Sequence, residues 1–432
     1  MVDITITKSE RLGSEVDAPP SKAYTHRALI ASLLSNGTSK ISNPLDCDDT
    51  QATLAAIKAL GARLDHEKNQ WVLKGLEEIE TPKTPVNCHE SGATMRFMIP
   101  VAALAPRDST FEIGPSLGRR PLAPLLQSLE QLGVKCNFQQ NKETSLVRIH
   151  GGGIKGGKAS IRGDISSQFI SGLLFACPKA KENVEINVTT PLESKSYVEM
   201  TMEVLMKHGI KVHATDDLTR FRIPPNQKYQ TYNHEVPGDF SSAAFLLAAA
   251  AITSSRVKVK NLDSHTVQGD KAILNILNQM GLNLVISDDH VEVRGGQLRA
   301  IDVDARDIPD LVPVCSALAC YSNGTFGIHN AKRLKYKESD RLSSLEVELK
   351  KMGARIRIDG ESVVVEGPCS IHGAVVDPHN DHRIAMACAV TALGADDETT
   401  IQNSECVKKS YPKFFEDLHS LGANVVGWQL HR

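Results

Sequence analysis

The chain has 432 residues, and its 49 lysine and arginine residues nearly balance its 51 aspartate and glutamate residues, for a formal net charge of −2. A single hydrophobic core does not grow to this size, so we expect two or three domains. The near-neutral charge excludes a global basic field for nucleic acid or an anionic membrane, so any anion site has to be local. The longest apolar run, 245–252, is too short to cross a bilayer.

The nine cysteines stand at scattered positions, without a C-x-x-C motif and without histidine at zinc-binding spacing. The first ten residues also lack the features of a secretory or transit peptide. We interpret the cysteines as reduced, mostly buried thiols of a cytoplasmic protein, and we expect no metal site.

The elements predicted along the chain repeat six times. Each repeat contains a second helix that is expected to end in the left-handed conformation at a glycine, about every 70 residues. These glycines are Gly61, Gly133, Gly209, Gly281, Gly353 and Gly422. Earlier in each repeat, a first helix follows a polar residue suited to cap it. The six expected caps are Ser21, Ser91, Ser166, Asp239, Asp310 and Asp381.

Short β-patterned runs separate and follow these helices, for example 38–43, 109–114, 255–262 and 324–330. Their order predicts an α/β protein, and six repeats exceed one core. The change from serine to aspartate caps after the third repeat favours a grouping of three and three, with a boundary near 234–238. The opening strand, DITIT, has to pair elsewhere, and we expect it to pair with the later half.

Equivalent helix ends point the same way in a repeated assembly, so the first helices are expected to direct their N-termini at one anionic ligand between the two groups. Polar and cationic residues mark these ends: Lys22, Arg27, Arg96, Ser166, Ser167, Gln168, His382 and Arg383. Further charged or polar residues precede the second helices: Asp49, Arg120, Ser194, Tyr197, Arg341 and Lys409. Taken singly, each of these residues is usually a solvated side chain or a cap. Jointly they indicate an anion site, because the macrodipole disfavours cations at the N-terminus of a helix and yet cations recur there.

The fifth repeat carries the densest charge, in the stretch 334–353. Lys337 and Arg341 are expected four residues apart on one helix face. Asp310, as a helix cap, and Glu338, beside Lys337, are candidates for proton transfer next to bound anions. The alternative is a solvated charge run that pairs with itself.

The motifs in these places resemble those of the 5-enolpyruvylshikimate-3-phosphate (EPSP) synthase family, over essentially the whole chain. They are SKAYTHRA (21–28), SGATMR (91–96), RRP (119–121), SSQF (166–169), SKSY (194–197), IPD (308–310), YKESDR (336–341), NDHRIAM (380–386) and KKSYP (408–412). The resemblance implies a cofactor-free transferase of chorismate and aromatic amino acid biosynthesis. It would move the enolpyruvyl group of phosphoenolpyruvate (PEP) to the 5-hydroxyl of shikimate 3-phosphate.

The resemblance also implies a fold, a two-domain inside-out α/β barrel built from six βαβαββ-type units, three per domain. One domain would comprise 21–235, and the other would comprise 1–20, as a crossover segment, with 236–432. The active site would lie in the interdomain cleft. We expect a monomer that binds its two small substrates and neither nucleic acid nor membrane.

The family's functional residues carry over by position. Those implied to bind shikimate 3-phosphate are Lys22, Arg27, Ser166, Ser167, Gln168, Ser194, Tyr197, Asp310 and Lys337. Those implied to bind PEP are Lys22, Gly92, Arg120, Gln168, Arg341, Arg383 and Lys409. Asp310 would deprotonate the 5-hydroxyl, Glu338 would move a proton at the PEP methylene, and Lys22 and His382 would complete the catalytic set.

Four positions depart from the commoner bacterial pattern: Ala23, Glu90, Ala93 and Arg333. The nearest rival family, UDP-N-acetylglucosamine enolpyruvyl transferase, shares the fold and the PEP chemistry but carries a reactive cysteine ahead of an Arg-Pro pair. Here the equivalent loop is GPSLGRRP, without cysteine. A more distant alternative is a non-catalytic repeat scaffold that binds an anionic partner.

Overall fold

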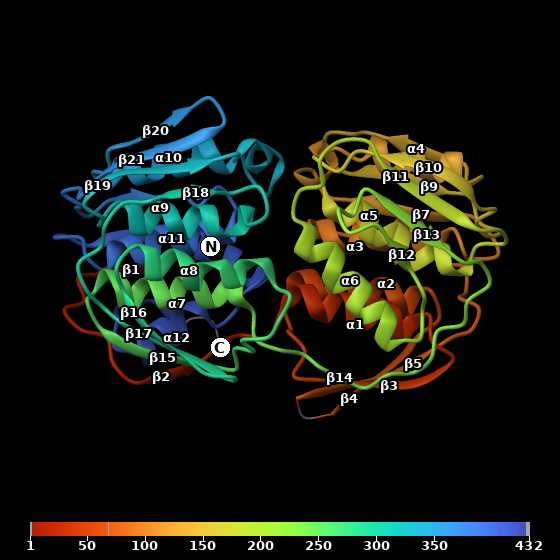
Figure 1. Ribbon diagram of the computed structural model, residues 1–432, viewed down its shortest axis with the longest axis horizontal. Coiled ribbons are helices and arrows are strands. Elements are labelled where there is room, and N and C mark those ends of the chain that lie inside the picture. The colour runs from red at the N-terminus through yellow and green to blue at the C-terminus, as the bar shows by residue number, and fades with distance from the viewer. Residues whose placement is uncertain (1, 68, 429–432) are drawn as a thin grey trace. The chain divides into compact units, whose positions relative to one another are not determined.

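The computed structural model describes residues 2–67 and 69–428 (Figure 1). The chain divides into two compact units, which we call the N-terminal unit (Ser21–Val236) and the C-terminal unit (Met1–Pro20 with Pro237–Arg432). Along the chain, the order strand, helix, strand, helix, strand, strand recurs, with a variation at the last repeat. The expected α/β class and its repeated order of elements are confirmed.

The N-terminal unit contains three pairs of helices. They are α1 (Lys22–Leu33), α2 (Asp48–Ala59), α3 (Gly92–Ala102), α4 (Ala123–Gln131), α5 (Ser167–Ala176) and α6 (Lys195–Lys207). Its strands are β3 (Gly37–Ser42), β4 (Arg63–Glu67), β5 (Gln70–Gly75), β6 (Val86–Asn87), β7 (Ser109–Ile113), β8 (Cys136–Gln139), β9 (Ser145–Ile149), β10 (Gly157–Ile161), β11 (Val184–Val188), β12 (His213–Ala214), β13 (Arg220–Ile223) and β14 (His234–Glu235). They form three four-stranded sheets, ordered β14-β3-β5-β4, β6-β7-β9-β8 and β10-β11-β13-β12.

The C-terminal unit repeats this plan. Its helices are α7 (Phe240–Ile252), α8 (Ile273–Gln279), α9 (Val312–Ala319), α10 (Arg341–Lys351), α11 (His382–Ala392) and α12 (Phe414–Ser420). Its strands are β1 (Ile4–Thr7), β2 (Glu15–Asp17), β15 (Arg256–Lys260), β16 (Asn283–Ile286), β17 (His290–Arg294), β18 (Asp302–Asp304), β19 (Gly324–His329), β20 (Ile356–Asp359), β21 (Ser362–Gly367), β22 (Val375–Val376), β23 (Thr399–Ile401) and β24 (Asn424–Val426). The sheets are ordered β2-β15-β17-β16, β18-β19-β21-β20 and β22-β23-β1-β24.

The strand pairing shows which sheets the opening segment joins. β1 pairs antiparallel with β23 and β24, so the prediction that the first strand joins the later half is confirmed. β2 pairs in parallel with β15 of the C-terminal unit, and β14, from the end of the third repeat, pairs in parallel with β3 of the first. Each sheet thus consists of one parallel pair extended by antiparallel strands.

Burial puts the first helix of each repeat inside and the sheets outside. Twelve of the thirteen residues of α7 are buried, and all of α3 and α11 are. The strands instead alternate between buried and more exposed positions, as in β9 and β17, because one face of each sheet meets solvent. In the C-terminal unit α7, α9 and α11 pack against one another, and in the N-terminal unit α3 packs against α1 and α5.

The repeated glycines end the second helices as predicted. All six have a positive φ, between 75° and 100°. At Gly353, after α10, a Cβ would lie 2.5 Å from the carbonyl oxygen of Ser370. Both the positive φ and this close contact therefore disfavour any larger residue at the position.

Two local predictions are wrong. Five expected caps accept a hydrogen bond from the first turn of their helix, but Asp310 does not cap α9, because it lies within a short 3₁₀ turn, Pro309–Leu311, that precedes this helix. Lys337 and Arg341 do not share a helix face either. α10 begins at Arg341, capped by Asp340, while Lys337 follows another 3₁₀ turn, Lys332–Tyr336, in an extended conformation.

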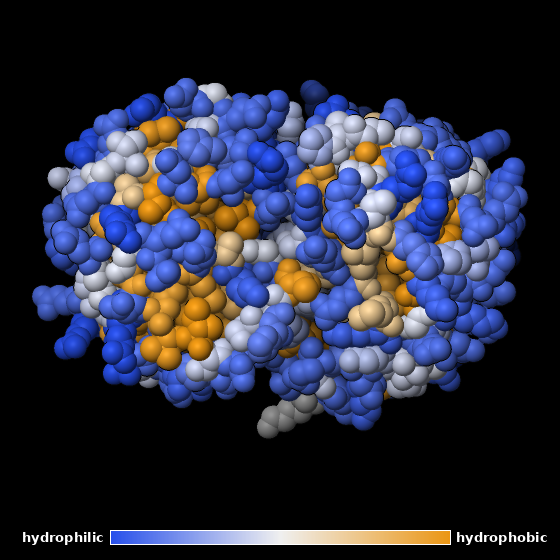
Figure 2. Space-filling view, viewed as in Figure 1, coloured by the Kyte–Doolittle hydropathy of each residue, from blue (hydrophilic) through white to orange (hydrophobic). Residues whose placement is uncertain are grey.

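The visible surface is mostly hydrophilic (Figure 2). Apolar atoms gather on it in the C-terminal unit, in the areas where Figure 1 labels α9 and, separately, α7 and β16. Val285 and Ile286 of β16 are among the exposed large apolar side chains. Within the described part of the chain, the helices are all too short or too polar to cross a membrane.

Candidate active site

Asp310 is the centre of a charged cluster in the C-terminal unit. Its Oδ1 lies 3.2 Å from Nζ of Lys337 and 2.9 Å from Nη1 of Arg341, and its Oδ2 lies 3.3 Å from Nη2 of Arg383. Two segments far apart in the sequence, one with Lys337 and Arg341 and the other with Arg383, therefore bring cations to one carboxylate. The turn that replaces the expected cap is what leaves both carboxylate oxygens of Asp310 available to these cations.

Arg341 is 1% exposed and contacts two further carboxylates. Its Nη2 donates to Oε2 of Glu338 at 2.6 Å, and its Nε donates to Oδ2 of Asp381 at 2.8 Å. Asp381 also accepts from Oγ of Ser339 at 3.1 Å and caps α11 through the main-chain N–H of Arg383. One guanidinium thus links Asp310, Glu338 and Asp381.

Arg383 is fixed by α7 as well as by Asp310. Its Nη2 donates to Oγ of Ser241 at 2.9 Å, and Ser241 in turn donates to Oδ1 of Asp239 at 2.5 Å. Arg383 is 3% exposed. The first turns of α7 and α11 therefore hold this cation beside Asp310.

The electrostatics of the cluster favour its ionised form. Burial alone would raise the pKa of Asp310, but the charges of Arg383, Lys337 and Arg341 outweigh it and hold that pKa well below its usual range. Burial lowers the pKa of Lys337, against the pull of Asp310. Arg341 has its pKa raised, because Asp381, Glu338 and Asp310 outweigh its burial. In this state Asp310 is a carboxylate rather than a carboxylic acid.

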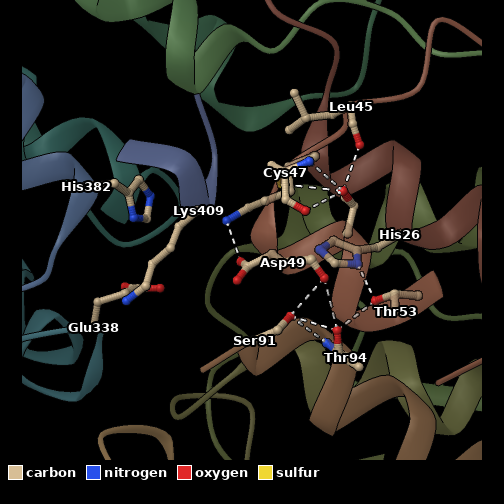
Figure 3. Close-up of polar contacts among 12 residues, drawn as sticks. His26, Leu45, Cys47, Asp49, Thr53, Ser91, Thr94, Glu338, His382 and Lys409 are labelled. Atoms are coloured by element: carbon tan, nitrogen blue, oxygen red, sulfur yellow. Dashed lines mark hydrogen bonds and ion pairs between the residues drawn. The ribbon is translucent and has the colours of Figure 1, made fainter. Parts of the chain in front are cut away.

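Two more predicted residues of the C-terminal unit lie close to these elements. Lys409 ends a 3₁₀ turn, Ser404–Lys409, and donates to the main-chain oxygen of Asn380 at 3.0 Å, next to the start of α11. His382 is the first residue of α11 and is 1% exposed. Figure 3 shows His382, Lys409 and Glu338 in this part of the molecule.

In the N-terminal unit, Lys22 and Asp49 form an ion pair at 2.9 Å between the first turns of α1 and α2. The main-chain oxygen of Asp49 lies 3.4 Å from Oγ of Ser91 and 3.3 Å from Oγ1 of Thr94, at the start of α3 (Figure 3). Hydroxyl groups of α3 thus fix the start of α2, and through Asp49 they orient the Lys22 ammonium.

Arg27 is 2% exposed and ties α1 to α6. It donates from Nε to Oγ1 of Thr201 at 2.9 Å, from Nη1 to the oxygen of Ala23 at 2.8 Å and from Nη2 to the oxygen of Tyr197 at 2.7 Å. Its guanidinium also lies 5.8 Å from the centre of the Tyr197 ring. Burial lowers the pKa of Arg27 to about 10.

The third repeat contributes the residues around Ser166. Ser166 caps α5, Ser167 begins it, and the Gln168 side chain accepts from Nη1 of Arg96 at 2.8 Å. Ser194 stands before α6 with a left-handed φ of 55° and is 3% exposed. The structure therefore brings Gln168 together with Arg96 of α3, and it puts Tyr197 beside Arg27.

The start of α3 brings Gly92 close to two arginines. A Cβ at Gly92 would lie 3.4 Å from Nη1 of Arg96 and 3.5 Å from Nη1 of Arg120. Glu90, one of the unusual positions, accepts from the main-chain N–H of Ser116 at 3.0 Å and of Leu117 at 2.7 Å. Glu90 thereby anchors the loop that leads to Arg120.

Sequence reasoning missed the roles of Asp381 and Ser241. Asp381 was expected only as a cap, yet its carboxylate also binds Arg341, and Ser241 binds Arg383. The signal available was the mostly apolar helix at whose start each residue lies, because burial of such a helix also buries the polar groups at its start. In the described residues there is no group of three or more histidine, cysteine, aspartate or glutamate side chains placed to hold a metal ion.

Comparison with known proteins points to one family. The family profile described as EPSP synthase (3-phosphoshikimate 1-carboxyvinyltransferase) matches residues 6–418. A relative named 3-phosphoshikimate 1-carboxyvinyltransferase from Methanocella arvoryzae is 44% identical, covering 97% of this chain and 99% of the relative. One of the same name from Methanocaldococcus jannaschii is 40% identical, covering 98% and 99%.

Solved structures share the fold. An EPSP synthase from Acinetobacter baumannii superposes with a TM-score of 0.83 at 24% identity, over 98% of this chain and 99% of that one. The enolpyruvyl transferase NikO from Streptomyces tendae reaches 0.79 at 18% identity, over 98% of both chains. The expected two-domain enolpyruvyl transferase fold is therefore confirmed. Because the profile and the relatives both span nearly the whole chain, this protein belongs to the EPSP synthase family.

Proposed function

We propose that the chain is a 3-phosphoshikimate 1-carboxyvinyltransferase, which converts PEP and shikimate 3-phosphate into 5-enolpyruvylshikimate 3-phosphate and phosphate. The observation that carries the proposal is the carboxylate of Asp310, held by Lys337, Arg341 and Arg383 next to Glu338, in a chain of this family. A general base and a general acid beside fixed cations are what this reaction requires.

The residues of the C-terminal unit divide the chemistry between them. Asp310 accepts the proton of the 5-hydroxyl, and Lys337, 3.2 Å from it, holds the hydroxyl oxygen and the adjacent anion. Glu338 delivers a proton to the PEP methylene and removes it again when the tetrahedral ketal expels phosphate. Arg341, Arg383 and Lys409 bind the PEP carboxylate and phosphate, with His382 supporting this site.

The ion pairs of Asp310 suggest how substrate binding prepares the base. Asp310 is a weak base while three cations hold its pKa low. When PEP anions take up part of the hydrogen bonding of Arg341 and Arg383, the pKa of Asp310 rises toward the value that proton abstraction needs. Substrate binding then activates the base, so that Asp310 does not have to be basic beforehand.

The residues of the N-terminal unit bind the remaining groups. Ser166, Ser167 and Ser194 receive the phosphate of shikimate 3-phosphate, while Arg27, Gln168 and Tyr197 hold the rest of that substrate. Lys22, Gly92 and Arg120 contact PEP, and Gln168 contacts it as well. The support is positional: Gly92 lies against the guanidinium of Arg120, and Gln168 is oriented by Arg96.

One assay separates the proposal from its rivals. The protein is mixed with PEP and either shikimate 3-phosphate or UDP-N-acetylglucosamine, and phosphate release is followed. Release with shikimate 3-phosphate alone is expected. Release only with the nucleotide sugar would point to the other enolpyruvyl transferase, and release with neither would leave an anion-binding scaffold.

We also propose that the enzyme acts as a cytoplasmic monomer, with the domains 21–235 and 1–20 plus 236–432 acting on one pair of substrates. The free thiol state of all nine cysteines, seven of them buried, agrees with a reducing compartment. Light scattering during size-exclusion chromatography tests the monomer, and a mass of two chains would contradict it.

A further inference from the structure

Two thiols of the C-terminal unit lie against each other, apart from the cluster around Asp310. Cys320 is the residue after α9, and Cys369 lies just beyond the end of β21. The main-chain N–H of Cys369 donates to the main-chain oxygen of Cys320 at 2.8 Å. Each thiol also shifts the pKa of the other. The end of a buried helix thus meets the end of a surface strand at a pair of sulfurs.

The main chains around this pair are held close on both sides. Gly324 of β19 pairs with Gly367 of β21, and a Cβ at Gly367 would lie 2.5 Å from the oxygen of Ala319. A single main-chain hydrogen bond of 2.8 Å, together with ordinary N–Cα, Cα–C and C=O bond lengths, keeps the Cα atoms of Cys320 and Cys369 within about 7 Å of each other. Disulfides span Cα separations of roughly 4.4 to 6.8 Å. The backbone geometry therefore suits a disulfide without a large movement.

The two sulfurs have different surroundings. Cys369 is half-buried, and its Sγ accepts from the main-chain N–H of Arg355 at 3.3 Å. The Arg355 side chain stays beside it by donating to the oxygens of Glu366 at 2.9 Å and Pro368 at 3.1 Å. The neighbouring Cys320 thiol, with the contributions of Arg355, lowers the pKa of Cys369 to about 6 despite burial and the nearby Glu366. Cys320 is fully buried, and its pKa is raised.

We propose that Cys320 and Cys369 form a reversible dithiol–disulfide pair, because a 2.8 Å main-chain hydrogen bond joins them and, of the two, only Cys369 is open to solvent. Its oxidant is a low-molecular-weight disulfide. The Cys369 thiolate attacks one sulfur of that disulfide and expels one thiolate. Cys320 then loses its proton and attacks Sγ of Cys369, expelling the second thiolate. Two protein thiols are oxidised, and the oxidant takes up two electrons and two protons as two thiols.

The disulfide would make the C-terminal unit more rigid. It would close the segment between residues 320 and 369, which includes β19, β21 and all of α10. It would also fix the C-terminal end of α9, whose other end continues from the turn that carries Asp310. We therefore expect the oxidised protein to unfold at a higher temperature than the reduced protein, because the cross-link restricts the unfolded chain.

The test uses the whole protein and glutathione disulfide as the probe. The folded protein is incubated in glutathione buffers of increasing oxidised fraction, quenched with N-ethylmaleimide and digested without reductant. Mass spectrometry is expected to find a peptide pair joined through Cys320 and Cys369, lost again on adding dithiothreitol. In the variant Cys320→Ala, the reaction is expected to stop at glutathione attached to Cys369.

Cys136 of the N-terminal unit provides the control. It is also half-buried, but burial raises its pKa to about 12, so it is expected to react at least tenfold more slowly than Cys369 at pH 7. Glutathione that stays on Cys369 in the wild-type protein would overturn the proposal, since Cys320 would then fail to resolve it. Equal labelling of Cys136 and Cys369 would overturn it too, because Cys369 would not be the entry point.

Discussion

Arg341 and Asp381 form an ion pair at 2.8 Å between two side chains that are 1% and 0% exposed. The pair that Arg341 forms with Glu338 is less buried, because the Glu338 side chain is 15% exposed. The pair with Asp381 joins the start of α10 to the start of α11, so it holds two of the segments that surround Asp310. It therefore links the stability of the C-terminal unit to the geometry of the proposed active site.

Replacing Asp381 with asparagine should cost stability and activity together. The amide still caps α11 but removes one of the three carboxylates that balance the buried Arg341 charge, so the loss should reach at most about 3 to 5 kcal/mol, the cost of a fully broken buried pair. Denaturant unfolding should show this loss in the free energy of unfolding. Asp396→Asn, which removes an exposed pair with Lys8, serves as the control and should leave that free energy unchanged. An equal loss of unfolding free energy in the two variants would show that the buried pair contributes no more to stability than the exposed pair.

This pair also shows where sequence reasoning stopped. The repeat of helices and glycines depends on local patterns, and the structure confirms it. Asp381 looks like an ordinary helix cap in the sequence, because its second function depends on Arg341, forty residues earlier in the chain. Likewise, Lys337 and Arg341 do share an anionic partner, but they reach Asp310 from a loop and a helix start rather than from one helix face. Residue spacing identifies the groups, and tertiary packing decides what they contact.

Asp310→Asn should reduce turnover by orders of magnitude while the protein stays folded. The amide cannot accept the proton of the hydroxyl, although it preserves the size of the side chain. Steady-state kinetics with both substrates would measure the loss, and a cooperative thermal transition would show that the fold is retained. Turnover near that of the wild-type protein would remove Asp310 as the base.

The same variant predicts a pH dependence of stability. The folded pKa of Asp310 lies well below its unfolded value, so the carboxylate stabilises the folded state above the unfolded pKa of about 3.9. This contribution is lost as the pH falls through the folded pKa. The difference in unfolding free energy between the wild-type protein and Asp310→Asn should therefore be larger at pH 7 than at pH 3. A difference that grows on acidification would contradict the depressed pKa.

Glu338→Gln should lower turnover strongly but leave the binding of shikimate 3-phosphate nearly unchanged. Glu338 is proposed to move a proton at PEP, whereas the second substrate is proposed to bind elsewhere. Calorimetric binding and turnover measured on the same sample would separate these effects. Glu346→Gln is the matched control, because Glu346 belongs to the same segment and pairs with Lys350 on the exposed side of α10. Both variants losing turnover alike would argue for a general effect of charge.

Gly353→Val should reduce stability without affecting catalysis directly. Gly353 has a φ of +90°, and a side chain there would also clash with the main-chain oxygen of Ser370. We expect a loss of about 2 kcal/mol or more in the free energy of unfolding. Gly360→Val separates the two causes, since Gly360 has a φ of +62° but open space around it. If both variants lose the same stability, only backbone strain matters and the clash is relieved.

A last prediction concerns two histidines in the N-terminal unit, far in sequence from the residues proposed for catalysis. Nε2 of His208 lies 2.8 Å from Nε2 of His234, and Nδ1 of His208 lies 2.7 Å from the main-chain oxygen of Gln230. A carbonyl only accepts, so Nδ1 of His208 carries a proton, and its Nε2 accepts from His234. Protonating His208 would set two N–H groups against each other.

Both pKa values follow from this arrangement. Burial lowers the pKa of His208 to about 4. At His234, burial and the neighbouring charges of His208 and Lys207 lower the pKa to about 3. The unfolded chain takes up these protons near pH 6.5, and the folded protein takes them up only at lower pH. Stability is therefore fully present above pH 6.5 and decreases as the pH falls from there toward 4, by an amount on the order of 3 kcal/mol per histidine.

Unfolding free energies measured between pH 7 and pH 4.5 test this. The wild-type protein should lose stability across this range, and His234→Gln, whose amide still donates to His208, should lose less. The substitution lies in β14, which pairs with β3, so its effect on stability at pH 7 is measured separately and subtracted. A variant with the same slope as the wild-type protein would mean that His234 takes up its proton alike in the folded and unfolded states, and would contradict the lowered pKa of His234.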